Sequence, residues 1–137
     1  VYAHRRDSEW HGAASAALAE LTDRVELWAI PWPCVHEFLN VVTSQRVFHA
    51  PTSMMRARQQ VEAWMESPFL RTLSETSRHW PVLADLLIQG RIAGRRVHDA
   101  RIAALCLEHG VDELWSADRD FSRIAGLKVR NPLLGRA

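Results

Sequence analysis

The sequence VHDARIAALCLEHGVDELWSADRDF, residues 97–121, contains the pattern that decides the fold. Residues 97–108 contain a strongly apolar run and Gly110 follows them, which predicts a buried helix with a glycine at its C-terminal end. Residues 113–116 predict a short strand, and residues 128–130 predict a second one. A helix placed between short strands is typical of a parallel sheet covered by helices.

The same alternation extends back to the start of the chain. Asp7 or Ser8 is expected to cap a first helix, and Pro33 suits the first turn of a second. The segment Pro51-Thr52-Ser53 is expected to break the chain and cap a third helix. Parallel strands with helices on both faces follow from this order, so the fold class is α/β. The expected elements outside residues 97–130 are a helix over 8–23, a strand over 25–30, helices over 33–42 and 53–66, an extended piece over 69–73 and a helix over 78–89.

Composition excludes several classes of protein. The chain has 137 residues, of which 47% are hydrophobic and 24% charged, so it is long enough and apolar enough to fold as one compact domain. No apolar run is long enough to span a bilayer, and the opening residues VYAHRRDS lack the apolar core of a signal peptide, so we expect a cytoplasmic protein without a membrane segment. Cys34 and Cys106 lack metal-binding or redox spacing and predict buried thiols.

Four acidic residues do not fit a solvated helix surface. Glu37 lies between apolar positions, Asp99 opens the apolar helix, and Asp118 and Asp120 directly follow a predicted strand. Each has a plain structural alternative. Asp99 could be a first-turn residue that the helix dipole favours, and Asp118 or Asp120 could cap a short helix. Glu37 could pair with an arginine such as Arg46 or Arg101.

Taken together, these acids predict a metal site. Ligands in an open parallel sheet bind beyond the carboxyl ends of the strands, where helix N-termini also point. Carboxylates gathered there would repel one another by several kcal/mol, on the order expected for close, partly buried charges, unless a cation intervened. Oxygen donors without a cluster of cysteines or histidines favour Mg²⁺, with Mn²⁺ as a plausible substitute.

Three segments together resemble one known family. VHDARIAALCLEHGVDELWSADRDFSRIAGL, followed by NPL, resembles the C-terminal half of a PIN domain, and most of all the VapC-type toxins of type II toxin–antitoxin pairs. That family has Asp-Ala at a helix start, an alanine-rich helix, a glycine, a short strand and then T-x-D-x-D-F, where Ser116 here replaces the threonine. IPWPCVHEFLNVVT resembles the segment that carries the family's conserved glutamate, and VYAHR resembles the residues after its first strand.

The resemblance implies a single PIN domain over residues 1–137, a three-layer α/β/α sandwich around a mostly parallel sheet of short strands. It implies a Mg²⁺-dependent endoribonuclease that cleaves RNA phosphodiesters with a metal-activated water. Carried over by position, the metal-binding and catalytic acids are Glu37, Asp99 and Asp118, Asp120 is an auxiliary catalytic acid, and Ser116 is the hydroxyl on the substrate side.

The family also implies partners and raises one alternative. The expected partners are an RNA substrate, a cognate VapB-type antitoxin and a second copy of the chain, with no membrane involved. In the family the first metal-binding Asp lies on an opening strand, which we expect to precede Val1 in the complete protein. If that acid is truly absent, the alternative is a non-catalytic PIN-like module that binds RNA or protein.

Overall fold

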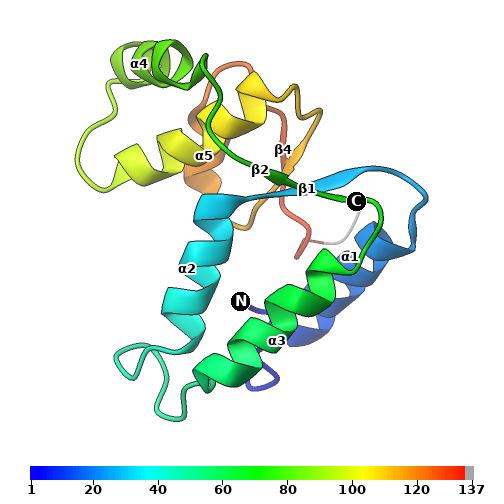
Figure 1. The fold of residues 1–137 in the computed structure, drawn as a ribbon. Helices are drawn as coiled ribbons and strands as arrows, with labels where there is room; N and C mark the ends of the chain where they lie inside the picture. Colours follow the sequence, from blue (N-terminus) through cyan, green and yellow to red (C-terminus); the bar gives the residue numbers. More distant parts are fainter. Residues whose placement is uncertain (135–137) are drawn as a thin grey trace. The chain divides into compact units, whose positions relative to one another are not determined.

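The computed structural model describes residues 1–134, and the chain forms two compact units, Val1–Thr72 and the part from Leu73 onward. Helices and short strands alternate in both units, which confirms the predicted α/β class (Figure 1). None of the helices within residues 1–134 has the length and apolarity needed to cross a membrane. The elements are α1 (His11–Asp23), β1 (Trp28–Pro31), α2 (Trp32–Val42), α3 (Met54–Met65), β2 (Leu70–Leu73), α4 (His79–Gln89), α5 (Arg96–Glu108), β3 (Leu114–Trp115), the 3-10 helix η1 (Arg119–Arg123) and β4 (Val129–Arg130).

The core of the first unit lies between α2 and α3, which pack against each other. Phe38 and Val42 of α2 and Ala57 of α3 are buried against one another, and the Trp64 ring meets the Phe38 ring edge-on at 4.8 Å. Ser53 caps α3, since its Oγ accepts a hydrogen bond from the Arg56 amide, as the sequence predicts.

The start of α1 differs from the prediction. The helix begins at His11, and neither of the expected caps serves it. The Asp7 carboxylate accepts two hydrogen bonds from the Arg5 guanidinium, and Ser8 Oγ accepts a bond from the Trp10 amide. The Asp7 carboxylate therefore pairs with Arg5 and does not cap the N-terminus of α1, although capping propensity alone favours that role.

The first strand also begins later than predicted. β1 (Trp28–Pro31) hydrogen-bonds with β2, and the Trp28 amide donates to the Phe69 carbonyl. Val25 and Leu27, which the sequence placed in this strand, are largely exposed. The partner strand β2 is itself only four residues long, so apolar residues before Trp28 have no neighbouring backbone with which to pair.

In the second unit, α5 is buried on almost every side. Its apolar run is expected to lie in a protein interior, and α4 packs beside it (Figure 1). The predicted helix over 97–108 and its burial are confirmed. The buried residues of α5 are Ala100, Ile102, Ala103, Ala104, Leu105 and Cys106.

Residues at the end of α5 form hydrogen bonds with the segment 74–79, which leads into α4. The Glu108 side chain is fully buried, and its two carboxylate oxygens bond His79 Nδ1 at 3.0 Å and Thr76 Oγ1 at 2.9 Å. His109 Nε2 lies 2.7 Å from the Ser74 carbonyl oxygen. Because a buried carboxylate is costly unless it is hydrogen-bonded, these partners are required for Glu108 to be accommodated there.

The last two strands pair in parallel, as predicted, with Leu114 opposite Val129 and Trp115 opposite Arg130. The Ser116 amide donates to the Arg130 carbonyl at 2.9 Å, so the backbone is still tethered to β4 where β3 ends. The loop into η1 therefore starts at a fixed point at the carboxyl end of a parallel strand.

Gly110 ends α5 with a left-handed turn, as the sequence predicts. Its φ is +67°, its amide donates to the Leu107 carbonyl, and the Val111 amide donates to the Cys106 carbonyl at 2.9 Å. These two bonds satisfy carbonyl groups that the end of the helix would otherwise leave unpaired.

Replacing Gly110 with Ala is expected to lower the free energy of unfolding by about 1 kcal/mol, because a Cβ disfavours the left-handed conformation. Gly12→Ala is the matched control. A Cβ at either glycine would meet no atom within 4 Å, but Gly12 lies in α1 without a positive φ. The control should gain up to about 1 kcal/mol. Urea denaturation measures both variants, and equal effects of the same sign would contradict the backbone explanation.

Candidate active site

Asp99 lies in the first turn of α5, in an environment that disfavours its charge. The pKa of its half-buried carboxyl is raised, first by burial and then by the nearby carboxylates of Asp118 and Asp120. His98 and Arg96 oppose the rise without reversing it. Three acids from the start of a helix and from the end of a strand therefore share one electrostatic environment in the second unit.

Asp118 and Ser116 are held by a chain of short-range hydrogen bonds. Asp118 Oδ1 accepts from the Asp120 amide at 2.8 Å and so caps η1, which confirms the capping alternative for this residue. The Asp118 amide in turn donates to Ser116 Oγ at 3.1 Å. The Ser116 oxygen acts as an acceptor in this bond, so its O–H remains available as a donor toward a phosphate oxygen.

Asp120 is oriented by the same short helix. Phe121, the next residue, is buried and anchors η1, while the Asp120 carboxylate lies 3.5 Å from the Arg123 guanidinium. Both partners of this ion pair are substantially exposed, so it contributes little to stability. Asp120 is therefore placed mainly by the backbone of η1, next to a residue whose burial fixes that backbone.

Glu37 lies on α2 in the first unit, exposed beside the buried Phe38. The suggested ion pair with Arg101 is not formed, because that guanidinium bonds the Glu75 carboxylate instead. The grouping of Glu37 with the acids of the second unit stays a prediction.

The chemistry of the donors fits a magnesium ion better than a transition metal. Within residues 1–134, no set of three or more histidines, cysteines, aspartates or glutamates is close enough to enclose a metal ion. Mg²⁺ does not need such a set, since it usually keeps several waters and binds through one or two carboxylates. Burial and the repulsion from Asp118 and Asp120 raise the pKa of the Asp99 carboxyl, and a divalent cation would relieve that repulsion.

Cys106 does not offer the thiolate that a soft metal needs. Cys106 is buried in α5, and burial raises the pKa of its thiol to about 11. Cys34 lies half-buried in α2, and both cysteines are free of disulfides. Cys106 is thus a packing residue, as the sequence predicts, and the candidate site uses oxygen donors.

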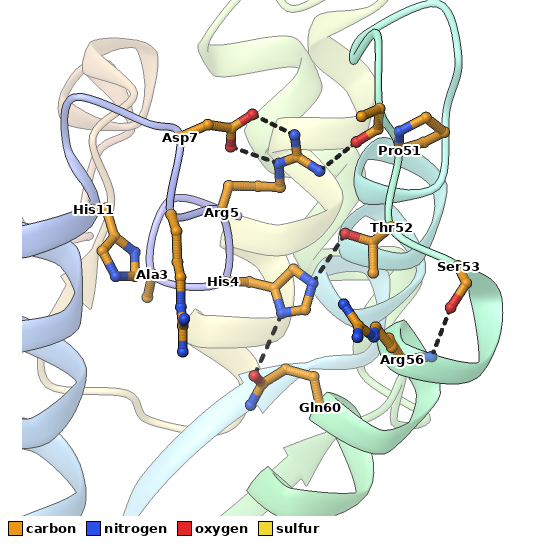
Figure 2. Close-up of a pocket in the computed structure, with 12 residues that line it drawn as sticks. Ala3, His4, Arg5, Asp7, His11, Pro51, Thr52, Ser53, Arg56 and Gln60 are labelled. Atoms are coloured by element: carbon orange, nitrogen blue, oxygen red, sulfur yellow. Dashed lines mark hydrogen bonds and ion pairs between the residues drawn. The ribbon is translucent and has the colours of Figure 1, made fainter.

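Sequence reasoning missed a polar cavity in the first unit. It has a volume of about 1040 Å³, and its walls come from two segments far apart in the chain (Figure 2). The adjacent arginines Arg5 and Arg6 were a signal for it, but nothing local showed which segment they would face. The cavity is lined by Ala3, His4, Arg5, Arg6, Asp7, His11, Ala50, Pro51, Thr52, Ser53, Arg56 and Gln60.

Comparison with known proteins is consistent with this architecture. The model of the family described as PIN domain matches residues 1–127. Ribonuclease VapC43 of Mycobacterium tuberculosis is 37% identical over 136 residues, covering 99% of this chain and 92% of that protein. Ribonuclease VapC48 of the same organism is 30% identical over 135 residues, covering 98% and 93%.

A solved structure shows the same fold. The crystal structure of VapBC2 from Rickettsia felis, bound to a DNA fragment from its promoter, aligns with a TM-score of 0.65 and 18% sequence identity, covering 95% of this chain and 90% of that one. The predicted PIN-like α/β fold is therefore confirmed. By its family match and by its identity to these relatives over nearly its full length, the chain belongs to the PIN domain family.

Proposed function

We propose that this protein is a Mg²⁺-dependent endoribonuclease, the toxin of a VapBC-type toxin–antitoxin pair. The observation that carries the proposal is the environment of Asp99, whose carboxyl pKa is raised first by burial and then by the nearby carboxylates of Asp118 and Asp120. Relatives that match nearly the whole chain are named ribonucleases, which supports RNA as the substrate. A cluster of like charges that costs stability is typical of a functional site.

Asp99 and Asp118 would bind the cation, directly or through water, and Asp120 would complete its coordination shell. A bound divalent ion polarises the phosphoryl oxygen and lowers the pKa of a water molecule. Ser116 would donate its free O–H to a phosphate oxygen, because its own oxygen already accepts from the Asp118 amide. The residues of the loop after β3 would thus orient the phosphate, while the carboxylates attract the cation.

Glu37 is proposed as a further acid of the reaction, which either joins the metal's surroundings or orients the attacking water. The proposal is supported by the resemblance of its segment to the family's glutamate-bearing segment. Its exposure and its lack of an ion pair within residues 1–134 leave the carboxylate available for such a role.

We propose that the whole chain, residues 1–137, acts as one PIN domain in the cytoplasm, as a homodimer silenced by a VapB-type antitoxin. The family match over residues 1–127 supports the single domain. The VapBC2 complex, which has the same fold, supports a VapB-type partner. Antitoxin arginines could neutralise the acidic cluster, since guanidinium groups pair with carboxylates through two parallel hydrogen bonds.

Asp99→Asn should reduce Mg²⁺-dependent cleavage of total RNA by about 100-fold or more, because the variant loses a charged oxygen at the proposed cation site. The full gene product is assayed with and without chelator. Asp112→Asn, an exposed aspartate of the same unit, is the control and should cleave normally. Unchanged cleavage by Asp99→Asn would remove Asp99 from the mechanism, and a wild-type protein that cleaves nothing would favour the non-catalytic module.

Asp99→Asn should also be more stable than the wild type near neutral pH without metal. A raised carboxyl pKa means that the folded state binds the proton more tightly than the unfolded state does, so ionisation of Asp99 destabilises the fold. The difference should disappear as the pH falls below the ordinary carboxyl pKa, where Asp99 is neutral in both states. Urea midpoints across this range measure it, and a variant less stable at neutral pH would contradict the assigned repulsion.

Glu37→Gln should lower the cleavage rate by about 10-fold or more at saturating Mg²⁺, since the amide keeps the shape of the side chain but not its charge. Glu66→Gln, an exposed change in the same unit, is the matched control. Equal rates for both variants would exclude Glu37 from the site, whereas a loss confined to Glu37→Gln would place its charge in the reaction.

A further inference from the structure

The cavity of the first unit is positively charged. Its lining contains three arginines, Arg5, Arg6 and Arg56, against one acid, Asp7, and its apolar side chains are limited to alanines and a proline. Figure 2 shows the labelled residues of the N-terminal segment on one side and those of the segment leading into α3 on the other. This composition suits an anion rather than an apolar ligand.

One wall of the cavity is fixed by Arg5. Its guanidinium donates to both oxygens of Asp7, donates to the Ala50 carbonyl at 2.8 Å, and lies 4.0 Å from the centre of the Phe48 ring. Arg5 therefore joins the two segments, and Asp7 offsets most of its charge. It shapes the cavity and is not its free cation.

His4, the residue before Arg5, joins the same two segments at a second point. Its ring nitrogens lie 3.1 Å from Thr52 Oγ1 and 3.4 Å from Gln60 Oε1, and its ring meets Phe38 edge-on at 5.2 Å (Figure 2). The ring is thus held by contacts to α2, to α3 and to the segment before α3. The cavity is a pre-organised hollow, because its walls are bonded to each other independently of a ligand.

Arg6 and Arg56 are the cations that remain available. Both are exposed, and neither forms an ion pair with another residue of 1–134. Arg56 lies in the first turn of α3, which contains no acidic residue to balance the positive end of the helix. Two unpaired guanidinium groups on one pre-organised cavity provide forked donors of the kind that phosphate groups accept.

A second hollow of about 530 Å³ shares Arg5 and Asp7 with the first. Its lining combines three aromatic side chains with one further acid, Glu9, and two of the aromatic residues, Tyr2 and Trp10, are 43% and 39% exposed. Exposed rings are the platforms on which unpaired bases stack. Guanidinium groups that can donate to phosphate thus lie near aromatic rings that can stack on bases. This arrangement matches the alternation of phosphate and base along a single strand of nucleic acid.

We propose that these adjoining hollows bind single-stranded RNA, with Arg6 and Arg56 on its phosphates and Trp10 and Tyr2 beneath its bases. That RNA is the ligand rests on the proposed function. An acidic protein segment is the less favoured occupant, since the cavity between Arg6 and Arg56 has no large apolar pocket for the anchor residues that peptides use.

The test measures RNA binding apart from cleavage. A fluorescein-labelled single-stranded RNA of about 12 nucleotides is titrated by fluorescence anisotropy against full-length protein carrying Asp99→Asn, so that the probe is not consumed. Adding Arg6→Ala and Arg56→Ala should weaken binding at least about 10-fold. It should also flatten the slope of log affinity against log salt by roughly 1.4, about 0.7 for each phosphate that the protein no longer neutralises.

Arg58→Ala is the matched control. This arginine lies on α3 outside the cavity and pairs with Glu62, so its removal should change neither the affinity nor the slope. Trp10→Ala should weaken binding several-fold and leave the salt slope unchanged, because stacking involves no phosphate charge. Arg6→Lys with Arg56→Lys should retain most of the affinity, and thermal unfolding of each variant checks that the fold is intact.

An unchanged affinity in the double alanine variant would overturn the proposal, as would an equal loss in Arg58→Ala. So would a double variant that still binds RNA but no longer binds polyglutamate, because the cavity would then serve an acidic protein. The proposed function can fail separately. If the wild type cleaves no RNA while the double variant loses RNA binding, the cavity's role stands and the nuclease activity does not.

Discussion

The candidate site depends above all on the burial of α5. A helix whose residues are buried from Ala100 to Cys106 with few interruptions cannot turn about its axis or slide without exposing apolar side chains or overlapping its neighbours. Truncating a fully buried side chain such as Leu105 to Ala would cost about 2–5 kcal/mol, so the position of this helix is strongly determined. Asp99, one residue before the buried run, inherits that fixed position.

That fixed position has an electrostatic cost. Asp99 is held where burial and the charges of Asp118 and Asp120 disfavour its ionised form, and no neighbouring cation reverses this effect. Asp118 cannot simply move away, because its carboxylate caps η1 and its amide is bonded to Ser116. The loop thus uses local hydrogen bonds to keep acids in a region that they destabilise, as expected when a site is shaped for a ligand rather than for stability.

The amino-acid sequence correctly predicted those elements that are determined by neighbouring residues in the chain. The apolar run of α5, the stop at Gly110 and the cap at Ser53 each depend on a few consecutive residues, and each is confirmed. The start of β1 was wrong because it depends on the length of a partner strand some 40 residues away, and the cap at Asp7 was wrong because Arg5 takes its carboxylate. The basic cavity was not predictable, since its two walls meet only through bonds such as that from Arg5 to the Ala50 carbonyl.

The carboxylates near Asp99 and the basic cavity of the first unit would have different roles toward the proposed RNA substrate. Carboxylates that attract a divalent cation also repel the phosphates of RNA, so they cannot by themselves supply affinity for the strand. The net charge of +1 gives the whole molecule almost no attraction for RNA either. Affinity must therefore come from a local concentration of cations, and the unpaired guanidinium groups of Arg6 and Arg56 on a cavity with fixed walls provide one. Under the proposed function, the basic cavity of the first unit would bind the polyanion, and the carboxylates near Asp99 in the second unit would hold the cation.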